Sequence, residues 1–200
     1  MRSDPTILAF DTSAAHCAAA LLIGGEVRYA AMEGMAKGQA ERLMPLLQEV
    51  MASASLSFDD LDAVAVGIGP GNFTGIRIAV SAARGLALGL GKPAVGVSTL
   101  EAQAYGKPRP CRAVADAKRG MFYVQDFGAV SGAPRLSDGQ DLSDDMPEAS
   151  PIDGTSLIYN IARIAAERLI AGDDIARPAP LYIRGADASP ASDPPPVILP

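Results

Sequence analysis

Short apolar runs separated by turn-forming residues occupy the first third of the chain, which is the pattern of strands joined by tight connections. We expect strands over Ile7–Asp11, Cys17–Ile23 and Glu26–Met32. Gly24-Gly25, between the second and the third, is a typical hairpin signal. The chain is therefore predicted to open with a β-meander.

Helical spacing of apolar residues appears next. A helix over residues 40–54 places Leu43, Leu47, Val50 and Ala54 on one face, and Met44 and Met51 widen that face beyond what a single buried side needs. Pro45 either lies in its first turn or kinks it. Further along, the pattern predicts a strand over Ala63–Ile68, a helix over Thr74–Leu90 and a strand over Ala94–Val97.

The character of the chain changes after Tyr105. A hairpin is expected over Arg112–Ala117 and Met121–Asp126, and an amphipathic helix over Leu157–Ile170. Residues 131–154 are turn-rich and acidic. The five prolines of residues 189–200 predict a disordered or loosely docked tail. We therefore divide the chain into a first lobe (1–105), a smaller second lobe (106–188) and the tail (189–200).

Charge and composition narrow the class of protein. With 200 residues and a net charge of −6, the chain is long enough for a real core but shows no basic stripe for nucleic acid. Any RNA in its biology is expected to be held by another subunit. Cys17 and Cys111 lie in apolar surroundings, so we expect both to be buried free thiols. The sequence has no apolar run long enough to span a membrane, so we expect no membrane span and a cytoplasmic location.

A glycine-rich turn, Gly67-Ile68-Gly69-Pro70-Gly71, joins a predicted strand to a predicted helix. Such turns bring backbone N–H groups close to anions. However, no Lys completes a Walker A loop, and both dinucleotide-fingerprint frames fail at Asn72 or Thr74. The turn is either a remnant of a phosphate site or a glycine connection needed for tight packing.

The helix that follows carries small residues at every fourth position, namely Ser81, Gly85 and Gly89. Glycine inside a helix costs about 1 kcal/mol relative to alanine, so two of them imply a packing reason. Arg77 and Arg84 flank this small-residue face. Two interpretations stay open: the face packs on the chain's own sheet, or it contacts a helix of another chain.

Four segments carry a family resemblance: ILAFDTSAAHCAAALL, GPGNFTGIRIAVSAARGLALGLGKPAVGVSTLEA, ADAKRGMFYV and PLYIRGADA. The hairpin opening with Asp11-Thr12-Ser13 resembles the actin/hexokinase (ASKHA) class, an α/β fold of two ribonuclease H-like lobes with mixed sheets, here with a reduced second lobe. In detail the segments resemble the TsaB (YeaZ) family, dimerization subunits of the bacterial machinery that makes N6-threonylcarbamoyladenosine at adenosine 37 of tRNA. The resemblance covers most of residues 6–126 and the stretch 178–188, and it does not extend over residues 131–156.

Comparison with the catalytic paralogue of that family, the TsaD type, indicates lost chemistry. The paralogue's two metal-binding histidines correspond here to Thr99 and Gln103, which are poor replacements for imidazole. His16 is the only histidine, so zinc-protease chemistry is excluded, and no Gly-x-Ser-x-Gly motif supports a serine hydrolase. The resemblance implies no catalytic residue, no metal site and no cofactor of its own.

We therefore expect a scaffold that pairs with a TsaD-type paralogue and works with a TsaE-type ATPase, where ATP, metal and tRNA are held by the partners. The same helices are expected to support a homodimer. Expected interface residues are Met44, Leu47, Met51, Arg77, Ser81, Arg84 and Gly85, and those of a vestigial nucleotide site are Asp11, Thr12, Ser13, Gly69 and Gly71. The alternatives are a small-metabolite kinase of the same fold class and a self-contained peptidase.

Overall fold

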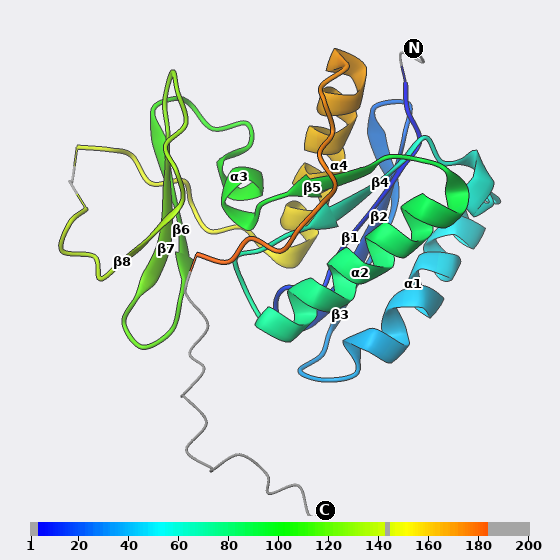
Figure 1. Ribbon diagram of the computed structural model, residues 1–200, viewed down its shortest axis with the longest axis horizontal. Helices are drawn as coiled ribbons and strands as arrows, with labels where there is room; N and C mark the ends of the chain where they lie inside the picture. Colours follow the sequence, from blue (N-terminus) through cyan, green and yellow to red (C-terminus); the bar gives the residue numbers. More distant parts are fainter. Residues whose placement is uncertain (1–3, 143–144, 184–200) are drawn as a thin grey trace, which may run out of the picture.

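The computed structural model describes residues 4–142 and 145–183, which form two β-sheets with helices packed mainly on the larger one (Figure 1). The larger sheet has the strand order β3-β2-β1-β4-β5. Its strands are β1 (Ile7–Asp11), β2 (His16–Ile23), β3 (Glu26–Gly34), β4 (Ala63–Gly67) and β5 (Ala94–Val97). Strands β1 to β3 pair antiparallel, whereas β4 and β5 continue the sheet in parallel, so the sheet is mixed.

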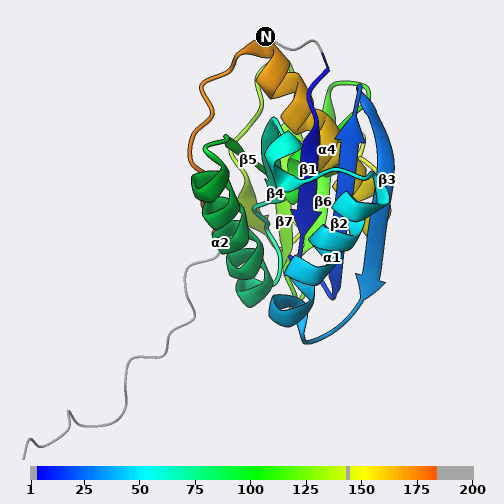
Figure 2. The same cartoon turned by 90° about the vertical axis from the view of Figure 1, so that its right-hand side faces the viewer.

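Helices cover both faces of this sheet (Figure 2). One face packs against α1 (Gln39–Ser53) and α2 (Phe73–Leu90), and the other against α4 (Gly154–Ala171). Along β1, Leu8 and Phe10 point to the first face while Ile7 and Ala9 point to the second. Because both of its faces are buried, β1 reads as a continuous apolar run.

The smaller sheet lies beside the first and is antiparallel, in the order β6 (Cys111–Asp116), β7 (Phe122–Phe127) and β8 (Arg135–Ser137). A short helix, α3 (Thr99–Ala104), packs against this sheet and a 3₁₀ turn, η1 (Phe58–Asp60), precedes β4. A large mixed sheet with a smaller second sheet confirms the predicted α/β class with a reduced second half.

Most predicted elements are present, and the differences have local causes. Helix α4 begins at Gly154 rather than Leu157, because the Asp153 side chain caps it by accepting from the Ser156 N–H at 2.7 Å. Pro45 lies inside α1 beyond the first turn. Strand β8, α3 and η1 were not expected, since three residues show no strand alternation and the six residues of α3 make fewer than two helical turns.

Helix α4 also shows that the predicted lobes share their parts. It follows the boundary at residue 105 in sequence, yet it packs on the first sheet. The boundary therefore separates the two sheets but not the helices that cover them. The predicted tail 189–200 lies outside the described residues.

After α4, residues 173–183 form no regular element and run back along α2; we call them the C-terminal strap (Figure 2). The Leu181 N–H donates to the Ile68 carbonyl at 2.8 Å, and the Arg84 Nε donates to the Pro178 carbonyl at 2.7 Å. The strap is thus tied both to the end of β4 and to α2.

Candidate functional site

Asp11, at the carboxyl end of β1, is completely buried and its carboxylate is engaged by its own chain. Its Oδ1 accepts from the backbone N–H and the hydroxyl of Ser13, both at 2.9 Å, and lies 2.7 Å from His16 Nε2. Its Oδ2 has no hydrogen-bond partner among the described residues and lies against Gly67, where any side chain would collide with it. The carboxylate therefore faces the protein interior.

The turn after Asp11 is locked to the glycine-rich loop. Thr12 Oγ1 donates to the Gly75 carbonyl at 2.6 Å, and the Asn72 N–H donates to the Ser13 carbonyl at 2.6 Å. A side chain at Gly75 would collide with the Thr12 carbonyl oxygen. The close approach of two backbones is thus one physical reason for glycine here.

Pockets for small ligands have volumes of about 300 to 1,000 Å³. A cavity of 620 Å³ opens between this turn, the loop and the β6–β7 hairpin. Ser13, Gly71 and Thr99 line it together with His16, whereas Asp11, Thr12 and Gly69 do not. Its loop offers few free donors, because Pro70 has no N–H and that of Asn72 is already used. The structure thus brings only part of the expected vestigial nucleotide site to the cavity.

Thr99 and Gln103 both lie on α3, one helical turn apart. Thr99 Oγ1 donates to the Pro70 carbonyl at 3.2 Å, and the buried Gln103 Nε2 donates to the Ala149 carbonyl at 2.8 Å. Within residues 4–142 and 145–183, no group of three His, Cys, Asp or Glu side chains is arranged to hold a metal ion. That the protein binds no metal ion stays a prediction.

The interface residues expected on α1 need correction. Leu47 and Met51 are buried in the core between α1, α2 and the sheet, because they face inward together with Leu43 and Val50. Of the three interface residues expected on α1, only Met44 is exposed. Leu47 and Met51 therefore support the helix rather than present a surface.

Helix α2, in contrast, turns its small-residue face to solvent. Ser81 and Gly85 are exposed, and a Cβ atom at Gly85 or Gly89 would meet no described atom within 4 Å. Leu88, on the same helix, is 84% exposed. The interpretation that these glycines pack on the chain's own sheet is therefore wrong.

The two arginines of α2 bind the C-terminal strap, which sequence reasoning did not find. Arg77 Nε donates to the Tyr182 hydroxyl at 2.7 Å, and its guanidinium lies 3.8 Å from the centre of the Phe73 ring. The Phe73 and Tyr182 rings stack with their centres 5.0 Å apart. Arg77 and Tyr182 are 105 positions apart in sequence, so no local pattern could signal this cluster.

Both cysteines are buried and free, as predicted. Burial raises the pKa of the Cys17 thiol to about 11. Among the described helices, α2 is long and apolar enough to span a membrane by length and composition alone. Its inner residues, among them Ile76, Ala79 and Ala83, pack in the core, and 28% of the helix is buried.

Comparison with known proteins gives a consistent result. A family model described as TsaD, tRNA N6-adenosine threonylcarbamoyltransferase, matches residues 33–137, just over half of the chain. The TsaB protein of Escherichia coli is 38% identical over 126 residues, covering 60% of this chain and 54% of the relative. That of Haemophilus influenzae is 39% identical over 99 residues, covering 50% and 42%.

The chain thus spans about half the length of these curated relatives. An uncharacterized protein of Mycobacterium tuberculosis is 33% identical over 167 residues, covering 78% of this chain and 79% of the relative. The solved structure of YeaZ from Pseudomonas aeruginosa superposes with a TM-score of 0.72 at 26% identity, covering 89% and 99%. The chain therefore belongs to the family described by the TsaD model and, within it, is of the TsaB (YeaZ) type.

Proposed function

We propose that the chain is a non-catalytic subunit that docks on a TsaD-type paralogue and supports N6-threonylcarbamoylation of adenosine 37 in tRNA. The TsaB relatives are named as tRNA threonylcarbamoyladenosine biosynthesis proteins, which supports this reaction class. The observation that carries the docking role is the exposed face of α2, where Ser81, Gly85 and Gly89 leave open space for another backbone.

The arrangement around Asp11 supports a subunit without its own catalysis. A carboxylate that binds Mg²⁺ needs an oxygen free to face the metal. Here Oδ1 is engaged by Ser13 and His16, and Oδ2 is buried against Gly67. Thr99 and Gln103 are likewise engaged by backbone carbonyls. We assign ATP, metal and tRNA to the partner subunits, including a TsaE-type ATPase, and the complex to the cytoplasm.

A small-metabolite kinase is the second candidate, and the 620 Å³ cavity beside Ser13 and Gly71 is the observation in its favour. Calorimetric titration with Mg-ATP separates the two candidates. A scaffold shows no micromolar binding by the isolated chain. Micromolar binding that is lost in the Ser13→Ala variant would support the kinase.

The docking role is tested by light scattering with the TsaD-type paralogue of the same organism. We expect a heterodimer from the mixture, a homodimer of the isolated chain at higher concentration, and loss of both in the Gly85→Leu variant. Gly34→Leu is the matched control, because Gly34 on β3 also has open space around it. A heterodimer that forms equally well with Gly85→Leu would contradict the docking surface.

A further inference from the structure

Phe73, Arg77 and Tyr182 form a cluster on the surface at the start of α2; we call it the aromatic–guanidinium cluster. The two rings stack, yet they remain 45% and 46% exposed. The Arg77 guanidinium lies over the Phe73 ring at 3.8 Å and 5.7 Å from the centre of the Tyr182 ring. Two half-exposed aromatic side chains and an arginine are the residue types that dominate the energy of protein interfaces.

The contacts within the cluster hold Arg77 in place but leave most of its donors unused. Its Nε donates to the Tyr182 hydroxyl at 2.7 Å. Within the described residues, no carboxylate lies within ion-pair distance of Arg77. A guanidinium that is fixed by stacking and has two free NH₂ groups is prepared for bidentate binding of a carboxylate, since less side-chain freedom is lost on binding.

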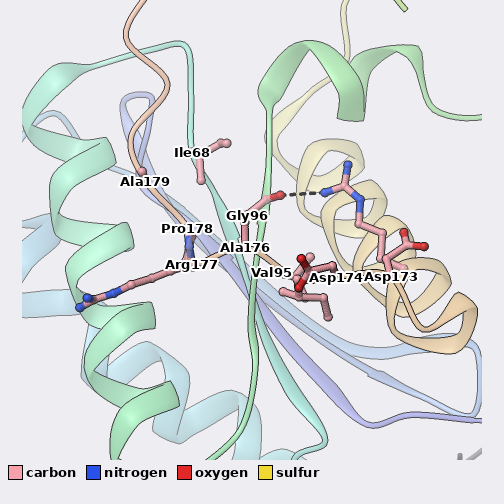
Figure 3. A pocket seen from close by; sticks show the side chains of 11 residues that line it. Ile68, Val95, Gly96, Asp173, Asp174, Ala176, Arg177, Pro178 and Ala179 are labelled. Atoms are coloured by element: carbon pink, nitrogen blue, oxygen red, sulfur yellow. Dashed lines mark hydrogen bonds between the residues drawn. The ribbon is translucent and has the colours of Figure 1, made fainter. Parts of the chain in front are cut away.

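The charge along the same edge of the molecule has one sign. The sequence of α2 contains no Asp or Glu. Beyond its small-residue face lies a groove of 420 Å³, which Arg84, Lys92 and Arg177 line together with Leu88, and no carboxylate of the described residues lines it. Figure 3 shows Arg177 extending from the strap toward α2, whereas Asp173 and Asp174, at the beginning of the strap, lie toward α4.

We propose that the aromatic–guanidinium cluster anchors this docking surface and that its occupant is a partner protein with a carboxylate placed over Arg77. The proposal rests on the proposed function and adds to it the chemistry of the partner. A cationic, partly apolar face on a chain of net charge −6 complements an acidic, partly apolar protein face. Nucleic acid fits less well, because binding it relies on many basic side chains spaced along the phosphates, whereas the cluster holds one guanidinium beside two aromatic rings.

Because Tyr182 belongs to the cluster, the C-terminal strap is part of the proposed docking surface. Two hydrogen bonds hold the strap near α2: the Pro178 carbonyl accepts from Arg84, and the Leu181 N–H donates to the Ile68 carbonyl. The docking surface is thus composite, and its integrity depends on a segment distant in sequence from α2.

Isothermal titration calorimetry with the purified TsaD-type paralogue tests the proposal in the Arg77→Ala, Arg77→Lys and Tyr182→Ala variants. We expect Kd to rise at least about tenfold in Arg77→Ala, and about fivefold in Arg77→Lys, which keeps the charge but loses the planar fork. Raising the salt concentration should weaken wild-type binding more than binding of Arg77→Ala. Arg163→Lys is the control, because Arg163 is exposed on α4, on the opposite side of the sheet.

The outcomes separate the two proposals. If the wild type binds the paralogue and all three variants bind within twofold of it, the anchor is wrong and the proposed function stands. If the wild type does not bind, the proposed function fails and the anchor fails with it. Gel-shift binding of tRNA by the isolated chain that Arg77→Ala abolishes would instead assign the cluster to nucleic acid. Unchanged melting temperatures show that the variants fold.

Discussion

At the scale of single residues, the buried guanidinium of Arg112 is paired with the carboxylate of Asp126. Its Nε donates to Asp126 Oδ1 at 2.6 Å, and Arg135 approaches Asp126 Oδ2 at 3.2 Å. The hydrogen bond from Arg112 holds the pKa of Asp126 below its usual range. A depressed folded pKa contributes stability above the ordinary pKa of about 4, and this stability is lost as pH falls through the folded pKa.

We therefore expect the Asp126→Asn variant to lose about 1 to 3 kcal/mol of unfolding free energy at pH 7. The difference from the wild type should begin to shrink as pH falls below about 4, where the unfolded chain takes up the proton first, and it should level off only below the lowered pKa of folded Asp126. Urea unfolding across this pH range measures both effects. Asp174→Asn, on the exposed strap, is the control, and a difference that does not change with pH would contradict the role given to the ion pair.

Cys17 gives a second prediction at this scale. Because the thiol is buried and its pKa is raised to about 11, the reactive thiolate is scarce at neutral pH. We expect Cys17 to resist alkylation by iodoacetamide in the native protein and to react quickly in urea, as read by peptide mass spectrometry. Fast native labelling would show that this side of the core opens.

Residue patterns predicted which side chains gather near the turn after β1, but not how they point. Asp11, Ser13 and Gly71 were all singled out, and they do come from neighbouring segments. The inward direction of the Asp11 carboxylate is set by His16 and by the space at Gly67, which belong to other strands. Such a direction depends on the finished sheet, so it is invisible in local sequence.

At the scale of elements, α2 has one side buried against the sheet and another side exposed to solvent. Its glycines look equivalent in sequence, yet Gly75 lies against the Thr12 carbonyl and Gly85 faces solvent. The same substitution should therefore have opposite effects at the two positions.

We expect Gly85→Ala to raise the unfolding free energy of the isolated chain by about 0.5 to 1 kcal/mol, because alanine loses less backbone entropy in an exposed helix. Gly75→Ala should lower it by about 1 to 3 kcal/mol, because the new methyl group forces the two backbones apart. Urea unfolding of both variants measures the pair. Changes of the same sign would refute this division of the helix.

Long elements were predictable because their spacing of apolar residues repeats several times along the sequence. Helix α2 and the hairpin of β2 and β3 each contain enough residues for a period to be read, whereas β8 has three residues. On α1, the apolar stripe was correctly placed, but Leu47 and Met51 were assigned to a surface. Periodicity shows which residues share a face and does not tell whether a sheet or a partner covers it.

At the scale of the whole molecule, contacts between distant segments shape the proposed docking surface. The strap ties α4 to α2, and Tyr182 completes a cluster whose other members lie 105 and 109 positions earlier. Such contacts follow from the chain's path over the sheet, which no segment specifies alone. The family resemblance indicated the fold, and the structure added which parts of α2 are free.

The most direct measurement of the central claim is threonylcarbamoyl transfer to tRNA by the TsaD-type paralogue, with and without this chain. We predict that synthesis requires the chain and that the Gly85→Leu variant does not support it. The His16→Gln variant, changed at the cavity beside Asp11, should support synthesis within about twofold of the wild type. Full activity with Gly85→Leu together with loss in His16→Gln would contradict the claim, since the cavity and not the face of α2 would then carry the function.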